Sequence, residues 1–171
     1  VYKYTLSGGS YTQSLVAGDS GGSSGSALNR LNYPTGIHVD SSENVYIADK
    51  NNHRVVKWEK GSSSYSSEGL VVAGNNSNGS ALNQLNNPYG VTVDSSGNVY
   101  VMEYVNHRIK VFDSAGTYLR SFGSYGGGCN QMAYPRQFQI FKDEIYIVNS
   151  NFHTVSKLSL TGQCIASSPT W

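Results

Sequence analysis

Apolar and polar residues alternate with a period of two over most of the chain. In residues 36–73, β-branched and aromatic residues such as Ile37, Val39 and Val45 alternate with other types, and clusters of Asp, Ser, Asn, Gly and Lys separate the runs. The pattern lacks the 3.6-residue period of an amphipathic helix, so the chain is predicted to be all-β. It predicts short antiparallel strands at 36–39, 44–48, 54–58 and 69–73.

The same pattern is repeated along the chain. Residues 28–36 match residues 82–90 at an offset of 54 residues, and shorter matches downstream keep that offset. A third copy, recognisable at Pro135 and at residues 144–147, is degenerate. The opening residues 1–4 resemble the third strand of the first copy. Internal repetition at this period indicates a fold that is built from stacked equivalent units.

Four strands in a repeat of about 45–54 residues are typical of one blade of a β-propeller. A single blade cannot bury both of its faces, so neighbouring blades must stack on it. We therefore expect one domain over residues 1–171, made of four-stranded antiparallel blades. The expected divisions are the second half of a blade at 1–17, full blades at 34–73 and 88–122, and a degenerate blade at 135–167.

Three segments of the first copy, residues 36–40, 44–49 and 52–55, resemble the NHL repeat. Residues 90–109 resemble it nearly as well, and the third copy does so mainly by position. NHL repeats are similar to WD40 blades and usually build a six-bladed ring. At about 45 residues per blade, six blades need roughly 270 residues. The resemblance thus implies an incomplete ring, either a fragment of a longer propeller or a module that closes with another chain.

The resemblance also implies a function. NHL-repeat proteins are mostly non-catalytic scaffolds for protein, RNA or glycan partners, and a minority are lyases or hydrolases. We expect a non-catalytic binding scaffold that presents variable loops to a protein or another ligand. The alternative is a hydrolase or lyase with a metal ion in the central channel. On the first strands only His38 offers an obvious metal ligand, and one ligand is too few for a metal site. The favoured interpretation of His38 is an ordinary strand residue.

Composition and charge limit the classes of partner that the chain is expected to bind. Only 13% of the residues are charged, and 12 Lys and Arg against 11 Asp and Glu leave a net charge of +1. The basic residues are scattered, so the sequence argues against binding of nucleic acid or of an anionic membrane. No run of about 18 apolar residues occurs, so no membrane span is predicted. A protein partner is the expectation.

His53, His107 and His153 occupy the same place in their copies. Three histidines could bind zinc or iron, but equivalent blade positions lie well apart on a ring. The favoured interpretation is structural, with each histidine fastening the turn between the second and third strands. Its hydrogen-bond partner is expected to be nearby backbone or the residue that ends the second strand, namely Asp49, Glu103 or Asn149.

Asp40 and Asp94 precede Ser-Ser turns, where a carboxylate caps the hairpin by accepting backbone N–H groups. They lie in separate blades, so a catalytic pair is not expected. Residues 126–128 are three glycines without the following Lys-Ser/Thr of a phosphate loop. Neither catalytic residues nor a cofactor nor a resident metal is therefore predicted.

The candidate binding residues lie in the loops that differ most between the copies. These loops lead into the first strand or join the second strand to the third, and they carry Tyr and Arg, which often anchor interfaces. The alternative is that they are ordinary residues of the surface or the channel rim. The candidates are Tyr33, Thr35, Lys50, Tyr89, Tyr104, Tyr134 and Arg136.

Cys129 and Cys164 are either two free thiols or one disulfide, and the sequence leaves both alternatives open. Glycosylation sequons begin at Asn75 and Asn78 in a polar loop. The sequons and the low charge favour an extracellular location, with a cytoplasmic one as the alternative.

Overall fold

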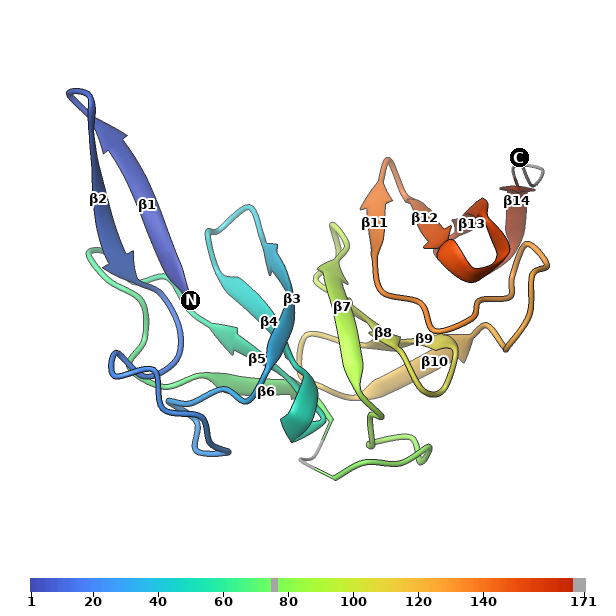
Figure 1. Ribbon diagram of the computed structural model, residues 1–171, viewed down its shortest axis with the longest axis horizontal. Helices are drawn as coiled ribbons and strands as arrows, with labels where there is room; N and C mark the ends of the chain where they lie inside the picture. Colours follow the sequence, from blue (N-terminus) through green and yellow to red (C-terminus); the bar gives the residue numbers. More distant parts are fainter. Residues whose placement is uncertain (75–76, 168–171) are drawn as a thin grey trace.

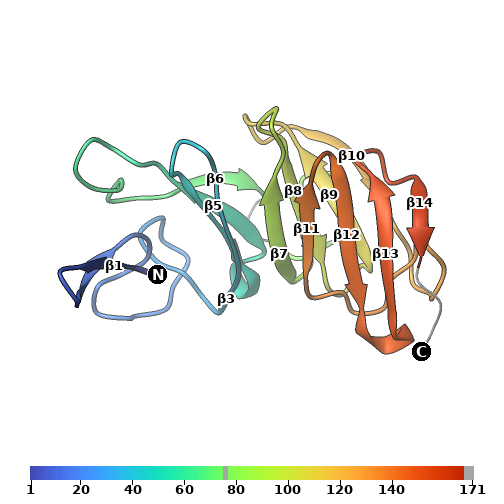
Figure 2. The same ribbon diagram turned by 90° about the horizontal axis from the view of Figure 1, so that it is seen from above.

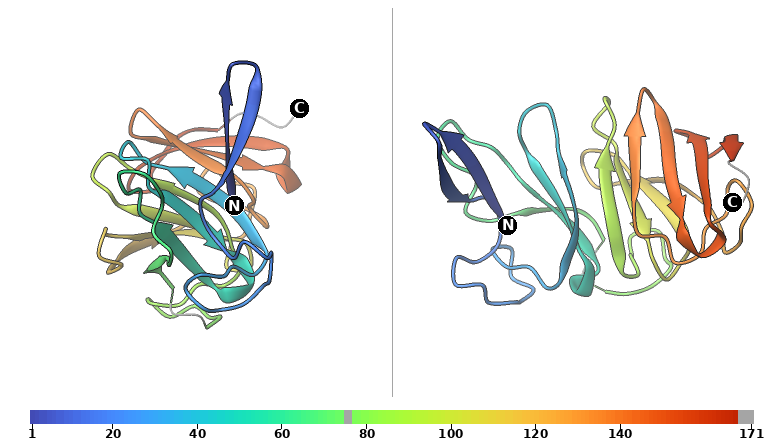
Figure 3. Two further views of the ribbon diagram at one scale, coloured as in Figure 1. Left: turned by 90° about the vertical axis from the view of Figure 1, so that its left-hand side faces the viewer. Right: turned by 45° about the horizontal axis from the view of Figure 1, so that its top comes forward.

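The computed structural model describes residues 1–74 and 77–167, which are organised as β-sheets (Figure 1). A two-stranded hairpin pairs β1 (Tyr2–Ser7) with β2 (Ser10–Leu15) and projects from the rest of the molecule (Figure 3). Three four-stranded antiparallel sheets follow. Among the described residues, no helix is long and apolar enough to cross a membrane.

Each four-stranded sheet is one blade, and its strands follow chain order. The first blade consists of β3 (Pro34–Val39), β4 (Val45–Asp49), β5 (Arg54–Trp58) and β6 (Leu70–Ala73). The second consists of β7 (Pro88–Val93), β8 (Val99–Glu103), β9 (Arg108–Phe112) and β10 (Tyr118–Phe122). The third consists of β11 (Phe138–Phe141), β12 (Glu144–Asn149), β13 (Thr154–Ser159) and β14 (Cys164–Ser167).

The blades stack face to face, so the core lies between them (Figure 2). Tyr46 and Val55 of the first blade pack on Val91 and Val101 of the second. The opposite face of the second blade contributes Tyr100, Met102 and Ile109 to a cluster with Ile145, Ile147 and Leu158 of the third blade. A third cluster packs Val16, Ala17 and Leu31 on Ile47, Val56 and Trp58 of the first blade. The predicted partial propeller of four-stranded blades is therefore confirmed.

The innermost strands β3, β7 and β11 lie along the concave side of an open arc (Figure 1). Gly36 marks a close approach of β3 to β7, because a Cβ atom built there would lie 2.6 Å from the Tyr89 carbonyl oxygen and 2.9 Å from the Gly90 Cα. Only glycine lets the two backbones come this near. This approach brings the loops at the end of each blade together.

Antiparallel order places the loops of each blade at two opposite ends. The hairpins that join first to second and third to fourth strands lie at one end. The predicted Asp40 and Asp94 caps form there: Asp40 Oδ1 accepts the N–H groups of Ser42 and Asn44, both at 2.9 Å, and Asp94 makes the equivalent bonds. Burial opposes ionisation of Asp40, yet the hydrogen bonds to its carboxylate hold its pKa below the ordinary value.

Candidate functional site

The loops that lead into the first strands carry two of the candidate binding residues, Tyr33 and Tyr134, and the other five lie next to these loops in the fold; we call them the lead-in loops (residues 25–33, 79–87 and 124–134). In the first blade, the lead-in loop is fastened by a buried ion pair. Arg54 Nε donates to Asp49 at 2.7 Å, and neither side chain is exposed. The remaining guanidinium nitrogens donate to three loop carbonyl groups, those of Ser26, Ala27 and Arg30, at 2.7–3.0 Å. The loop thus gains a rigid support from a strand.

In the second blade, one cation pairs with the buried acid and another donates most of the hydrogen bonds to the lead-in loop. Glu103 pairs with Arg108, whose side chain is 20% exposed and donates to only one loop carbonyl. Lys110 is buried instead and donates to the carbonyl groups of Ala81 and Gln84. Burial lowers the pKa of Lys110. Its equivalent in the first blade is Val56, so a different strand position supplies the support.

The third blade has no cation at either position. Thr154 and Ser156 stand there, and both hydroxyl oxygens are buried without a hydrogen-bond partner. Asn149 holds the loop by accepting the Ala133 N–H at 3.1 Å and donating to loop carbonyl groups. A disulfide between Cys129 and Cys164, with Cα atoms 5.7 Å apart, ties the same loop to β14.

The histidines connect one blade to the next. Each adopts a left-handed backbone conformation, and His53 Nδ1 accepts the N–H of Asn87 at 3.3 Å, while His107 Nδ1 accepts that of Tyr134 at 3.0 Å. This differs from the expectation that each histidine fastens its own turn. Burial lowers the pKa of His53, against the charge of Asp49, and also lowers the pKa of His107, which favours the neutral ring that can accept. Within the described residues, His153 makes no such bond to another blade.

The tyrosines predicted for the binding face lie next to one another as a row of rings. The centroids are 5.5 Å apart between Tyr89 and Tyr104, and 5.1 Å apart between Tyr104 and Tyr134. His107 extends the row, since its ring lies 4.6 Å from Tyr134 and 5.1 Å from Tyr125. The second blade contributes Tyr89, Tyr104 and His107 to this row and the third lead-in loop contributes Tyr125 and Tyr134, so the row joins the second blade to the third.

Two cations accompany the rings. Lys50 Nζ lies 4.7 Å from the ring centroid of Tyr33 and 5.5 Å from that of Tyr89, and the Arg136 guanidinium lies 5.8 Å from Tyr104. A hydrogen bond with Tyr104 raises the pKa of Arg136 above its ordinary value. We name this surface the tyrosine face, and it comprises Tyr33, Lys50, Tyr89, Tyr104, His107, Tyr125, Tyr134, Arg136 and Phe152.

A cavity of about 300 Å³ opens beside the tyrosine face. Three predicted residues, Thr35, Tyr89 and Arg136, line it. The innermost strands of all three blades supply its apolar wall, through Ile37, Val91 and Phe138. The cavity therefore combines one guanidinium group with apolar atoms.

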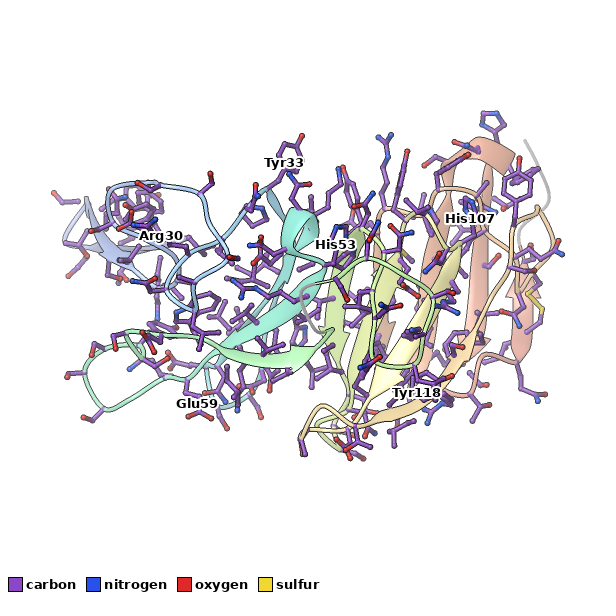
Figure 4. All side chains as sticks on the ribbon, turned by 90° about the horizontal axis from the view of Figure 1, so that it is seen from below. Arg30, Tyr33, His53, Glu59, His107 and Tyr118 are labelled. Carbon is purple, nitrogen blue, oxygen red and sulfur yellow. A yellow bond between two sulfur atoms is a disulfide. The ribbon has the colours of Figure 1, made fainter. Side chains whose placement is uncertain are left out.

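The structure thus brings all seven candidate binding residues to one end of the blades, where Figure 4 labels Tyr33, His53 and His107, whereas Glu59 lies at the opposite end of the blades. Tyr125 and Phe152 were missed, because the lead-in loop of the third blade has no counterpart of Tyr125 in the other copies. Asn78 is exposed, and Asn75 lies outside the described residues.

His38, the one histidine considered as a metal ligand, contacts a neighbouring strand instead. His38 Nδ1 lies 3.4 Å from the Thr92 hydroxyl on the next blade. Across residues 1–74 and 77–167, no group of three His, Cys, Asp or Glu is arranged to hold a metal ion.

Comparison with known families places a repeat model on the first two blades. The model described as NHL repeat matches residues 31–58 and 85–112. The chain is 27% identical over 154 residues to NHL repeat-containing protein 3 of Homo sapiens, which covers 86% of the chain and 40% of that protein. It is 29% identical over 85 residues to Protein brain tumor of Drosophila melanogaster, covering 48% of the chain and 8% of that protein.

Solved structures share the fold. A streptogramin B lyase superimposes with a TM-score of 0.60 at 13% identity, covering 95% of this chain and 45% of the lyase. A chain of a nidogen/laminin complex superimposes with a TM-score of 0.57 at 18% identity, covering 80% of this chain and 47% of that one. The chain therefore spans less than half the length of these relatives.

Proposed function

Because the chain carries NHL repeats in the blades of a partial β-propeller, we propose that it is a non-catalytic scaffold that binds a protein partner on the tyrosine face. The observation that carries this proposal is the contrast between strands and loops. The strands repeat closely, whereas the loop residues that differ between the copies gather on one surface. Variable loops on a rigid scaffold are the usual place for binding residues.

The chemistry of the face supports protein binding. Tyrosine and arginine anchor protein interfaces more often than other residues, because they combine apolar area with a polar tip. Tyr33 is 63% exposed and Tyr134 is 44% exposed, so their rings are available to a partner. The contacts within the row restrain the rings before binding, which reduces the entropy that association must overcome.

A matched pair of triple variants tests the proposal. The face variant combines Tyr89→Ala, Tyr104→Ala and Arg136→Gln. The control combines Tyr4→Ala, Tyr11→Ala and Lys3→Gln, which likewise removes two tyrosines and one cation, here from the exposed hairpin. A photo-crosslinking residue at position 35 is used to capture and identify the partner, and its affinity is then measured for both variants. We expect loss of binding in the face variant alone, and undiminished binding there would refute the proposal.

The alternative function, a metal-dependent hydrolase or lyase, rests on likeness to the streptogramin B lyase. At 13% identity this likeness concerns the fold alone. Metal analysis of the purified protein discriminates between the two functions. If the protein contained stoichiometric zinc or calcium and turned over a substrate, the scaffold proposal would be wrong and the protein would be an enzyme.

We also propose that the scaffold works outside the cell. The Cys129–Cys164 disulfide supports an oxidising compartment, and the exposed sequon at Asn78 is accessible to glycosylation. Mass spectrometry of the protein from its natural source tests this location. A glycan at Asn78 and an oxidised cysteine pair are expected, and two free thiols without a glycan would contradict it.

A further inference from the structure

Charge is divided unequally between the two opposite ends of the blades. The carboxylates that are not buried lie mostly on the hairpins opposite the tyrosine face, at Asp40, Glu43, Glu59, Glu68, Asp94, Asp113, Asp143 and Glu144. On the side of the tyrosine face, Asp49 and Glu103 are fully buried and paired with arginines. Asp19 is partly exposed there, and it interacts with Arg30. The tyrosine face itself carries Lys50 and Arg136 and no carboxylate.

Lys50 and Arg136 have no carboxylate partner in the described part of the chain. The ion pairs there involve Lys3, Arg54, Lys57, Arg108 and Lys157. Both cations instead lie over tyrosine rings. An incoming carboxylate therefore gains a charge-assisted hydrogen bond without breaking an existing ion pair.

Arg136 also lines the cavity of about 300 Å³, whose wall includes Ile37, Val91 and Phe138. A ligand that fits must present an anion to the guanidinium and an apolar group to the wall. An extended peptide presents side chains at short, regular intervals to alternate sides. Acidic and apolar side chains in one segment meet both requirements.

We propose that the tyrosine face binds an acidic peptide segment of the partner, with a carboxylate on Arg136, a neighbouring apolar side chain in the cavity, and a second carboxylate near Lys50. This deepens the proposed function and rests on it. The rings of Tyr89 and Tyr104 lie between the two cations and contact the segment between its carboxylates.

Charge favours a peptide over a nucleic acid. A single-stranded nucleic acid also stacks on aromatic rings, but its affinity comes largely from several neutralised phosphates. The tyrosine face offers two cations, and the chain has a net charge of only +1. Two carboxylates can be matched by two cations, whereas a run of phosphates cannot.

Fluorescence anisotropy with defined probes tests the proposal. The probes are a labelled heptapeptide of alternating glutamate and leucine, its glutamine counterpart, and an octauridylate. The variants are Arg136→Gln and, as a control, Lys142→Gln, which removes an exposed cation at the opposite end. We expect the glutamate peptide to bind about tenfold more tightly than the glutamine peptide, which corresponds to one charge-assisted hydrogen bond. Arg136→Gln should remove that difference and Lys142→Gln should keep it.

Each other outcome overturns the proposal. Equal binding of the two peptides, an unchanged affinity in Arg136→Gln, tighter binding of the octauridylate, or no binding of either peptide would each contradict it. If both peptides bind equally and both are lost in the Tyr89, Tyr104 and Arg136 triple variant, the face still binds peptides. In that case the acidic specificity fails while the proposed function stands.

Discussion

The first and third blades fasten the same loop by different chemistry. In the first blade, the buried pair of Asp49 and Arg54 holds the lead-in loop through three backbone carbonyl groups. In the third blade, Asn149 replaces the acid, Thr154 replaces the arginine, and the Cys129–Cys164 disulfide ties the loop to β14. Both loops nevertheless deliver a tyrosine to the tyrosine face: Tyr134 joins the row of rings directly, and Tyr33 is linked to it through Lys50, which lies over both Tyr33 and Tyr89.

This difference shows that the fold requires a support for the lead-in loop rather than one particular kind of bond. An arginine stabilises the native loop by donating to carbonyl groups, whereas a disulfide also restricts the unfolded chain. The bond closes a loop with a sequence separation of 35, which the chain-entropy description values at about 4 kcal/mol. Support for the lead-in loop is thus kept in both blades, and its chemical form is free to change.

Removing Arg54 should have the largest effect. Arg54→Met leaves the Asp49 carboxylate buried without its cation, so we expect the free energy of unfolding to fall by roughly 3–5 kcal/mol. Urea denaturation measures the change. In the double variant Asp49→Asn with Arg54→Met, which approaches the neutral state of the third blade, part of the loss should be recovered. A loss below about 1 kcal/mol in the single variant would refute the role assigned to the ion pair.

Removing the disulfide should have the next largest effect. Cys129→Ser with Cys164→Ser should lower the free energy of unfolding by about 2–4 kcal/mol. Urea denaturation of the wild type with and without a reductant provides the same comparison without a substitution. If the double variant and the reduced wild type are as stable as the oxidised protein, then the disulfide is not the counterpart of Arg54.

The second blade keeps the ion pair but supports its lead-in loop mainly through Lys110, so a Lys110 variant tests that support separately. Lys110→Met keeps the length of the side chain but removes the donors to the Ala81 and Gln84 carbonyl groups, so we expect a loss of about 1–3 kcal/mol. The matched control is Val56→Met at the equivalent position of the first blade, where no polar contact is lost. An equal loss in both variants would assign the effect to packing alone.

Acidification should have the smallest effect, and it acts between blades. Histidine has an ordinary pKa of 6.5, and burial lowers the pKa of His53 and His107 in the folded protein. The unfolded state therefore binds more protons once the pH falls below about 6.5, so stability is lost from there towards the folded pKa and is fully present above 6.5.

Urea midpoints at pH 7.5 and pH 5.5 measure this effect. A variant with His53→Asn and His107→Asn is the control, because asparagine tolerates the left-handed backbone and does not titrate. His38, whose pKa burial also lowers, remains in both proteins. The wild type should lose more stability than the variant, and equal losses would contradict the inter-blade bonds.

Much of the fold was predictable because its signals are local and repeated. The period of two and the polar turn clusters between the runs predicted strands at 54–58 and 69–73, and the structure has β5 at Arg54–Trp58 and β6 at Leu70–Ala73. The offset of 54 residues also indicated which loops vary, and therefore which tyrosines to consider.

Contacts between blades were less predictable. The partner of His53 is a backbone group 34 residues away, and no local pattern indicates that distance. Lys110 has Val56 as its counterpart, so comparison of the copies gave no sign that it would replace Arg54. Pairing of Cys129 with Cys164 depends on a Cα separation that only the stacked structure provides.

Hydrogen exchange of the oxidised and reduced protein, followed by mass spectrometry, tests the central claim most directly. We predict that reduction accelerates exchange in the third lead-in loop, residues 124–134, while residues 25–33 and 79–87 keep their protection. Arg54→Met should give the opposite pattern, with faster exchange in residues 25–33 alone. If reduction changes exchange uniformly along the chain, or leaves residues 124–134 unchanged, the disulfide does not replace the cation as the support of that loop.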